Sequence, residues 1–200
     1  MKTIRWGALA AALATALASG SVLAESTYGY ASSGTGTISA TAKVNLSVTV
    51  AKLILLRVGS ASGTADTMTW SVGQTIPGVP TTPANGNGTA VNWDGTAPTV
   101  TTSADPAAIN VYAWTNATTP SINCSMGAWS GAGGPTNANF SVTVTGTLPH
   151  PGANLGACAS TAFPANTLAA GTWRYALGGT PGSWSAGTYT NTITYTAQGL

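Results

Sequence analysis

Charged residues are scarce in this sequence, which has six Lys or Arg, four Asp or Glu and one His among 200 residues. Nucleic-acid binding needs clustered Lys and Arg, and no such cluster occurs. Helix-favouring Glu, Lys, Arg and Gln are nearly absent, and no amphipathic helical period exceeds two turns. The composition therefore predicts an all-β fold without a nucleic-acid partner. Low charge also gives little electrostatic protection against self-association.

Catalytic groups are equally few. The single histidine, His150, lies between Pro149 and Pro151, and these stiff flanks predict an exposed loop. No nucleophile-elbow, phosphate-binding or EF-hand motif occurs. Nothing in the sequence brings the four carboxylates together as glycoside hydrolysis would require: Glu25, Asp66, Asp94 and Asp105. We therefore expect no enzymatic activity, no cofactor and no metal site.

Only two cysteines occur, Cys124 and Cys158. In an oxidising compartment such a pair is most simply a disulfide. Metal binding is the alternative, but zinc needs a clustered set of ligands that two cysteines and one distant histidine do not supply. The pair is therefore predicted to form a disulfide.

The N-terminus has the order of a secretory signal peptide. Lys2 and Arg5 precede an apolar run over 8–18, and Val22-Leu23-Ala24 resembles a cleavage site. The apolar run is shorter than the ~20 residues that span a bilayer. We expect a signal peptide over 1–24 and processed protein from Glu25, with Ser19 as an alternative start and a buried N-terminal helix as the alternative structure. The protein is thus expected to be exported, with a flexible lead over 25–35.

The clearest period-two pattern covers residues 36–50. Its odd positions are polar, and its even positions are apolar: Ile38, Ala40, Ala42, Val44, Leu46, Val48 and Val50. This pattern predicts a β-strand with one apolar face. Because typical strands have ~5–6 residues, we expect the segment either to bend between two sheets or to extend beyond its own domain.

Further strands are predicted along the rest of the chain. Four consecutive apolar residues over 53–56 favour a strand covered on both faces, and 187–197 alternates Thr with larger residues. Weaker candidates are 67–72, 89–93, 108–114, 139–145 and 172–177. Gly- and Pro-rich loops separate these segments, as in a sandwich. The prediction is one β-sandwich domain over 36–200.

Tryptophan offers a possible binding chemistry, because its large flat face can stack on sugar rings. Trp93, Trp114 and Trp173 lie in or beside predicted strands and are expected to be structural. Trp129 and Trp184 lie in Gly- and Ser-rich loops and are the candidates for binding a glycan.

The two ends of the chain resemble subunits of chaperone–usher fimbriae, including the spore-coat-U-like branch. The resemblance rests on the amphipathic segment 37–46 (TISATAKVNL) and the Thr-rich ending 185–195 (SAGTYTNTITY). The cysteines lie in the second half of the chain and five residues follow Tyr195, whereas the main pilin branch has an N-terminal disulfide and a penultimate tyrosine.

This resemblance implies an incomplete immunoglobulin-like sandwich that lacks its last strand. A periplasmic chaperone supplies a strand first, an outer-membrane usher assembles the subunits, and the N-terminal segment of a neighbour then replaces the chaperone's strand. The apolar positions of 36–50 are the candidates for exchange. The implied protein is a structural fimbrial or pilus subunit at the cell surface, with a role in cell adhesion.

Other interpretations of the pattern stay open at this point. Residues 36–50 could be an ordinary first strand of the domain. The protein could be a secreted carbohydrate-binding β-sandwich or, as a third hypothesis, a small outer-membrane β-barrel.

Overall fold

The computed structural model describes residues 26–61, 63–78 and 81–200. The expected signal peptide over 1–24 and the predicted first processed residue, Glu25, lie outside the described residues. The chain divides into two units, one reaching to Val50 and one from Ala51 to Leu200. The predicted single domain over 36–200 spans both units, so its compact part begins at Ala51.

The unit from Ala51 is all-β, as the composition predicts. Its described strands are β1 (Ile54–Val58), β2 (Val72–Thr75), β3 (Thr99–Thr102), β4 (Ile109–Thr115), β5 (Ser121–Met126), β6 (Phe140–Gly146), β7 (Thr161–Ala162), β8 (Ala169–Leu177) and β9 (Ile193–Gln198). Two short 3-10 turns, η1 (Asn137–Asn139) and η2 (Pro181–Ser183), complete the regular structure. Three open antiparallel sheets result, with orders β1-β4-β8-β6, β2-β3 and β7-β5-β9.

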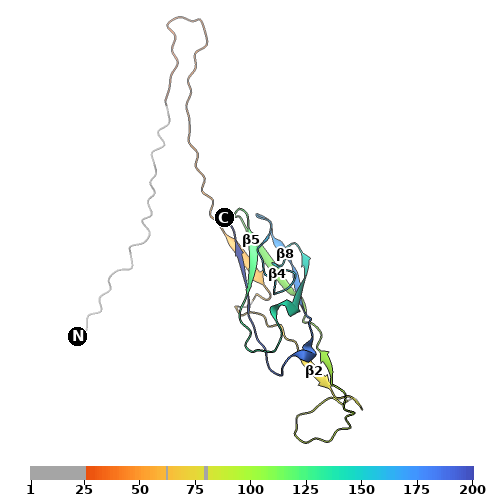
Figure 1. Ribbon diagram of the computed structural model, residues 1–200. Helices are drawn as coiled ribbons and strands as arrows, with labels where there is room; N and C mark the ends of the chain where they lie inside the picture. Colours follow the sequence, from red (N-terminus) through yellow and green to blue (C-terminus); the bar gives the residue numbers. More distant parts are fainter. Residues whose placement is uncertain (1–25, 62, 79–80) are drawn as a thin grey trace, which may run out of the picture. The chain divides into compact units, whose positions relative to one another are not determined.

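The two larger sheets share one hydrophobic core, which makes the fold sandwich-like (Figure 1). Residues of β4 alternate, so that Val111, Ala113 and Thr115 are buried while the residues between them are more exposed. From β8, Trp173 is fully buried, and β5 contributes Ile122. The strand period of two therefore places one face of each sheet in the core.

Predicted and observed strands agree where a segment of alternating apolar and polar residues also pairs with a neighbouring strand. The candidates 108–114, 139–145 and 172–177 correspond to β4, β6 and β8. The predicted 187–197 is shorter as β9, although Thr190 and Thr192 still accept backbone hydrogen bonds from Ser130 and Gly127.

Other strand predictions differ from the structure. The candidate 89–93 forms no strand, and the candidate 67–72 overlaps β2 only at Val72. The expectation that 53–56 is covered on both faces is wrong. Leu56 packs against the core, but Leu53 and Leu55 are 51% and 55% exposed on the other face of β1.

The first unit contains no strand within its described residues, 26–50. Every one of these residues is exposed, and Leu46 is 90% exposed. Thr27 donates a hydrogen bond from Oγ1 to the Thr41 carbonyl and accepts one from the Thr41 amide. The predicted strand over 36–50 is thus an exposed amphipathic segment, because a strand needs a ladder of backbone hydrogen bonds to a neighbouring strand, and the described residues of this unit form none.

Candidate functional site

The first strand of the compact unit leaves one edge open. β1 pairs with β4 in antiparallel register, Leu56 opposite Ala113. The Gly59 amide donates to the Asn110 carbonyl, which fixes the odd-numbered residues of β1 as those bonded to β4. The backbone groups of Ile54, Leu56 and Val58 therefore point to the opposite edge.

The last strand has the same feature. β9 pairs with β5, Tyr195 opposite Cys124. The Gly127 amide donates to the Thr192 carbonyl, so the even-numbered residues of β9 bond to β5. The backbone groups of Ile193, Tyr195 and Ala197 are directed to the other edge.

These two open edges, which we call the β1–β9 slot, face each other across the two sheets. Cα atoms of β1 and β9 approach within 8 Å, and the strands lie side by side in Figure 1 (β1 orange, β9 violet). Among the described residues no backbone hydrogen bond joins the two strands. A strand inserted between them would hold them about 9.6 Å apart, twice the usual spacing, so insertion must move their closest points apart by at least roughly 1.6 Å.

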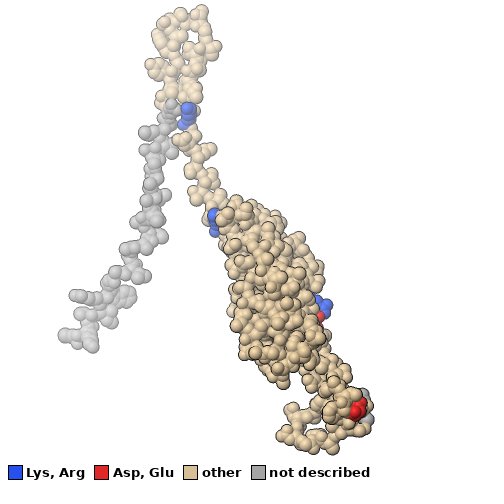
Figure 2. Space-filling model, viewed as in Figure 1, with Lys and Arg blue, Asp and Glu red and all other residues tan. Residues whose placement is uncertain are grey.

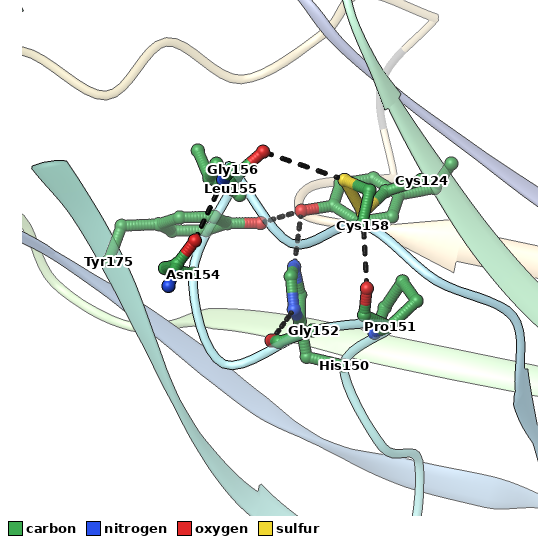
Figure 3. Close-up of a disulfide and its surroundings, with 10 residues drawn as sticks. Cys124, His150, Pro151, Gly152, Asn154, Leu155, Gly156, Cys158 and Tyr175 are labelled. Carbon is green, nitrogen blue, oxygen red and sulfur yellow. Dashed lines mark hydrogen bonds between the residues drawn. A yellow bond between two sulfur atoms is a disulfide. The ribbon is translucent and has the colours of Figure 1, made fainter. Parts of the chain in front are cut away.

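A buried polar chain anchors β9 from the core side. The Nε2 atom of His150 lies 2.8 Å from the Tyr195 hydroxyl, and this hydroxyl lies 2.8 Å from that of Tyr175 on β8. The other ring nitrogen, Nδ1, lies 2.6 Å from the Gly152 carbonyl (Figure 3). The chain thus links the two sheets and the loop that carries His150.

The direction of these hydrogen bonds follows from the Gly152 carbonyl, which can only accept. Nδ1 of His150 therefore carries the proton and donates to it. Burial lowers the pKa of His150, which keeps the ring neutral, so Nε2 accepts from Tyr195. Tyr195 in turn accepts from Tyr175, and burial raises the pKa of Tyr175 to about 12. Each polar side-chain atom of His150, Tyr195 and Tyr175 thus has a hydrogen-bond partner.

The predicted disulfide is present. Cys124 on β5 is bonded to Cys158, with their Cα atoms 5.2 Å apart. The bond ties the loop after His150 to the sheet that contains β9 (Figure 3). Such a bond is typical of proteins that leave the reducing cytosol.

His150 contradicts the sequence-based expectation of an exposed loop. Its side chain is only 6% exposed, and its ring packs edge-on against Trp173 at 4.8 Å between centroids. The flanking prolines do stiffen the turn, but Pro151 is itself fully buried. The partners that bury this histidine lie on distant strands, and no local pattern indicates them.

Each aspartate is held separately by its own hydrogen-bond partners. Asp66 accepts from Ser60, Asp94 from Thr96, and Asp105 from the Trp70 indole and the Leu177 amide. These hydrogen bonds lower the pKa of each carboxyl. Within the described ranges no three His, Cys, Asp or Glu residues form a group able to hold a metal.

The tryptophans are distributed differently from the prediction. Trp129, a glycan candidate, is half-buried, stacks on Phe140 at 5.4 Å and donates from Nε1 to Asn137. Trp184, the other candidate, is also half-buried at the end of η2. Trp93, expected to be structural, is instead 57% exposed. Trp173 lies in the core as expected.

No protein-family model, curated protein or solved structure matches this chain. In the part of the chain that the structure describes, no helix is long and apolar enough to cross a membrane.

Proposed function

We propose that this protein is a structural surface subunit that assembles by β-strand exchange. The exposed segment 36–50 of one copy would enter the β1–β9 slot of the next. The observation that carries the proposal is the coexistence of an unpaired amphipathic strand sequence and two unpaired strand edges. One-directional exchange of this kind joins copies head to tail, which generates filaments.

The donor side of this proposal rests on burial. Large apolar side chains of 36–50 are exposed: Ile38, Val44, Leu46, Val48 and Val50. Each gains about 1.5–3 kcal/mol on full burial, so leaving all of them in water is unfavourable. A slot that accepts alternate side chains would bury this face and leave the polar odd positions outside.

The acceptor side rests on hydrogen bonding. An added strand would bond to the free backbone groups of Ile54, Leu56 and Val58 on one side and of Ile193, Tyr195 and Ala197 on the other. In strand addition, backbone hydrogen bonds provide affinity and side-chain pockets provide specificity. Sheet edges that stay open are otherwise prone to uncontrolled pairing.

The surface supports close association of copies. Figure 2 shows a face of the 51–200 unit that is almost entirely uncharged. The whole unit carries three cationic and three anionic side chains: Lys52, Arg57, Arg174, Asp66, Asp94 and Asp105. Repulsion between copies is therefore weak.

The resemblance to chaperone–usher subunits supplies the rest of the proposal. The partners would be further copies or related subunits, with a periplasmic chaperone and an outer-membrane usher during assembly. The location would be a fimbrium at the cell surface, with a role in adhesion. The chemistry proposed is non-catalytic.

The test compares two single substitutions in the donor segment of the otherwise complete chain from residue 25. Leu46→Asp places a charge on the apolar face, whereas Ser47→Asp, the matched control, places it on the polar face. Size-exclusion chromatography with light scattering and electron microscopy would follow polymer formation. We expect polymers from the unsubstituted chain and from Ser47→Asp, and loss of polymers with Leu46→Asp. A monomeric unsubstituted protein, or equal behaviour of both variants, would contradict strand exchange.

A secreted carbohydrate-binding sandwich is a second candidate, favoured by the exposed ring of Trp93. Its Nε1 donates to the Thr96 carbonyl at 2.7 Å, which orients the indole beside the Asp94 turn. Glycan-dependent quenching of tryptophan fluorescence, lost in Trp93→Ala and retained in Trp184→Ala, would support this candidate. Absence of quenching across a panel of glycans would dismiss it.

A further inference from the structure

The three residues between the donor segment and β1 are held by one side chain. Asn116, just beyond the end of β4, accepts a hydrogen bond from the Leu53 amide at Oδ1 (2.8 Å). Its Nδ2 donates to the Ala51 carbonyl at 2.7 Å. The Asn116 amide and the Thr115 hydroxyl both donate to the Leu53 carbonyl. We call this set of bonds the Asn116 clamp.

The clamp keeps residues 51–53 extended. The Asn116 carboxamide takes the amide of Leu53 and the carbonyl of Ala51, as a neighbouring strand would take groups two residues apart. No turn or bend occurs over 51–53. The ladder between β1 and β4 is thus prolonged by a side chain.

This arrangement opposes insertion of the donor segment into the slot of its own molecule in the antiparallel sense. An antiparallel donor beside β1 would form a hairpin with it, and if the whole of 36–50 is to pair, the turn of that hairpin has to lie in 51–53. A hairpin turn needs at least two residues out of the extended conformation. Forming it would break the bonds from Asn116 to Ala51 and Leu53.

The parallel sense is blocked by length. Two parallel neighbouring strands need a crossover connection of about a dozen residues. Only residues 51–53 separate Val50 from β1. A donor on another molecule meets neither restriction.

We propose that Asn116 is a positioning residue that directs strand exchange between copies instead of within one copy. This inference rests on the proposed function and adds its regulation: the clamp suppresses a self-inserted monomer, so the partner of the slot is a second copy. The chain would otherwise have a concentration-independent route to cover its own slot.

The test uses the chain from residue 25 and measures the monomer fraction. Asn116→Ala removes the two side-chain bonds of the clamp, and Asn110→Ala is the matched control. Asn110 lies on the same face of β4, and its side chain makes no hydrogen bond among the described residues. Because two hydrogen bonds are lost, we expect the monomer fraction to rise about tenfold in Asn116→Ala and to stay unchanged in Asn110→Ala.

A second variant decides the question even if Asn116→Ala does not fold. Inserting Asn-Gly between Val50 and Ala51 supplies a hairpin turn while leaving the clamp intact. We expect monomers in which Leu46→Asp lowers the urea midpoint and Ser47→Asp does not, as burial of the donor face requires.

The outcomes separate this inference from the proposed function. If Leu46→Asp abolishes polymers but both the insertion and Asn116→Ala keep the distribution of the unsubstituted chain, exchange between copies holds and the role of Asn116 is overturned. If Leu46→Asp leaves polymers unchanged, strand exchange itself fails and this inference fails with it.

Discussion

Tyr195 on the last strand donates a hydrogen bond to Nε2 of His150, which lies in the loop between β6 and β7. Because Tyr195 also accepts from Tyr175 on β8, its hydroxyl joins three parts of the molecule. This oxygen atom therefore helps to hold β9, one wall of the β1–β9 slot, against the core, in addition to the pairing of β9 with β5.

Removing that oxygen should be costly. In Tyr195→Phe, Nε2 of His150 and the hydroxyl of Tyr175 both lose their partner inside the core. An unsatisfied buried polar group costs about 1–3 kcal/mol, so we expect the free energy of unfolding to fall by about 2–4 kcal/mol in urea titrations. Tyr112→Phe, on the outward face of β4, is the control and should change it by less than about 0.5 kcal/mol. Equal effects of the two substitutions would contradict a stabilising role for the hydrogen bonds that join Tyr195 to His150 and Tyr175.

Stability should also fall on mild acidification. Burial lowers the pKa of His150 from its ordinary value of 6.5. Below pH 6.5 the unfolded chain takes up a proton on His150, whereas the folded protein does not. The contribution of neutral His150 to the free energy of unfolding is therefore fully present above that pH and declines as pH falls toward the lowered pKa. The slope can reach about 1.4 kcal/mol per pH unit for one proton.

Unfolding free energies measured between pH 7.5 and 4.5 would reveal this dependence. The carboxyls of Asp66, Asp94 and Asp105 have pKa values below the ordinary 3.8, so they contribute at lower pH. The neutral variant His150→Gln should show a flat profile over the same range. A profile that keeps its slope in this variant would assign the dependence to another group.

The disulfide should provide a large part of the stability. It closes a loop with a sequence separation of 34, for which the chain-entropy model gives about 4 kcal/mol. We expect the double variant Cys124→Ser and Cys158→Ser to lose about this amount in urea titrations. Adding reductant to the unsubstituted protein should have the same effect, and a loss under about 1 kcal/mol in both would be inconsistent with this account.

A close backbone approach predicts strong sensitivity at Gly171. This residue lies on β8 opposite Gly146 of β6, and a Cβ added to it would collide with the Thr145 carbonyl. We expect Gly171→Ala to destabilise the fold by about 1–3 kcal/mol, because backbone atoms must move. Gly63→Ala meets nothing within 4 Å and should be tolerated in the same thermal unfolding measurement.

The sequence was sufficient to predict the fold class and several strands. Phe140, Val142 and Val144 alternate with Ser and Thr, and this period alone indicated β6. β5 was not predicted, although Ile122, Cys124 and Met126 alternate with polar residues over its six positions. Conversely, 89–93 and 36–50 alternate without forming strands in this structure. Periodicity shows which face a strand would bury, whereas a strand exists only where a partner offers hydrogen bonds.

The candidate site was predicted only in half. The donor face of 36–50 follows from local alternation. The open edges of β1 and β9 depend on which strands pair across the fold, and these pairings join residues far apart in sequence. For the same reason, no sequence pattern near His150 indicates its contacts with Tyr175 and Tyr195. No pattern near Asn116 indicates its bonds to Ala51 and Leu53.

The 51–200 unit carries few charges, with equal numbers of each sign. This balance determines how ionic strength would affect the rate at which molecules associate. Long-range steering accelerates association only when partners carry opposing fields, and it weakens as ionic strength rises. With three cationic and three anionic side chains on this unit, encounter rates should stay near the unsteered value of about 10⁵–10⁶ M⁻¹s⁻¹. A fibre grown from such subunits would elongate at much the same rate in dilute buffer and in brine.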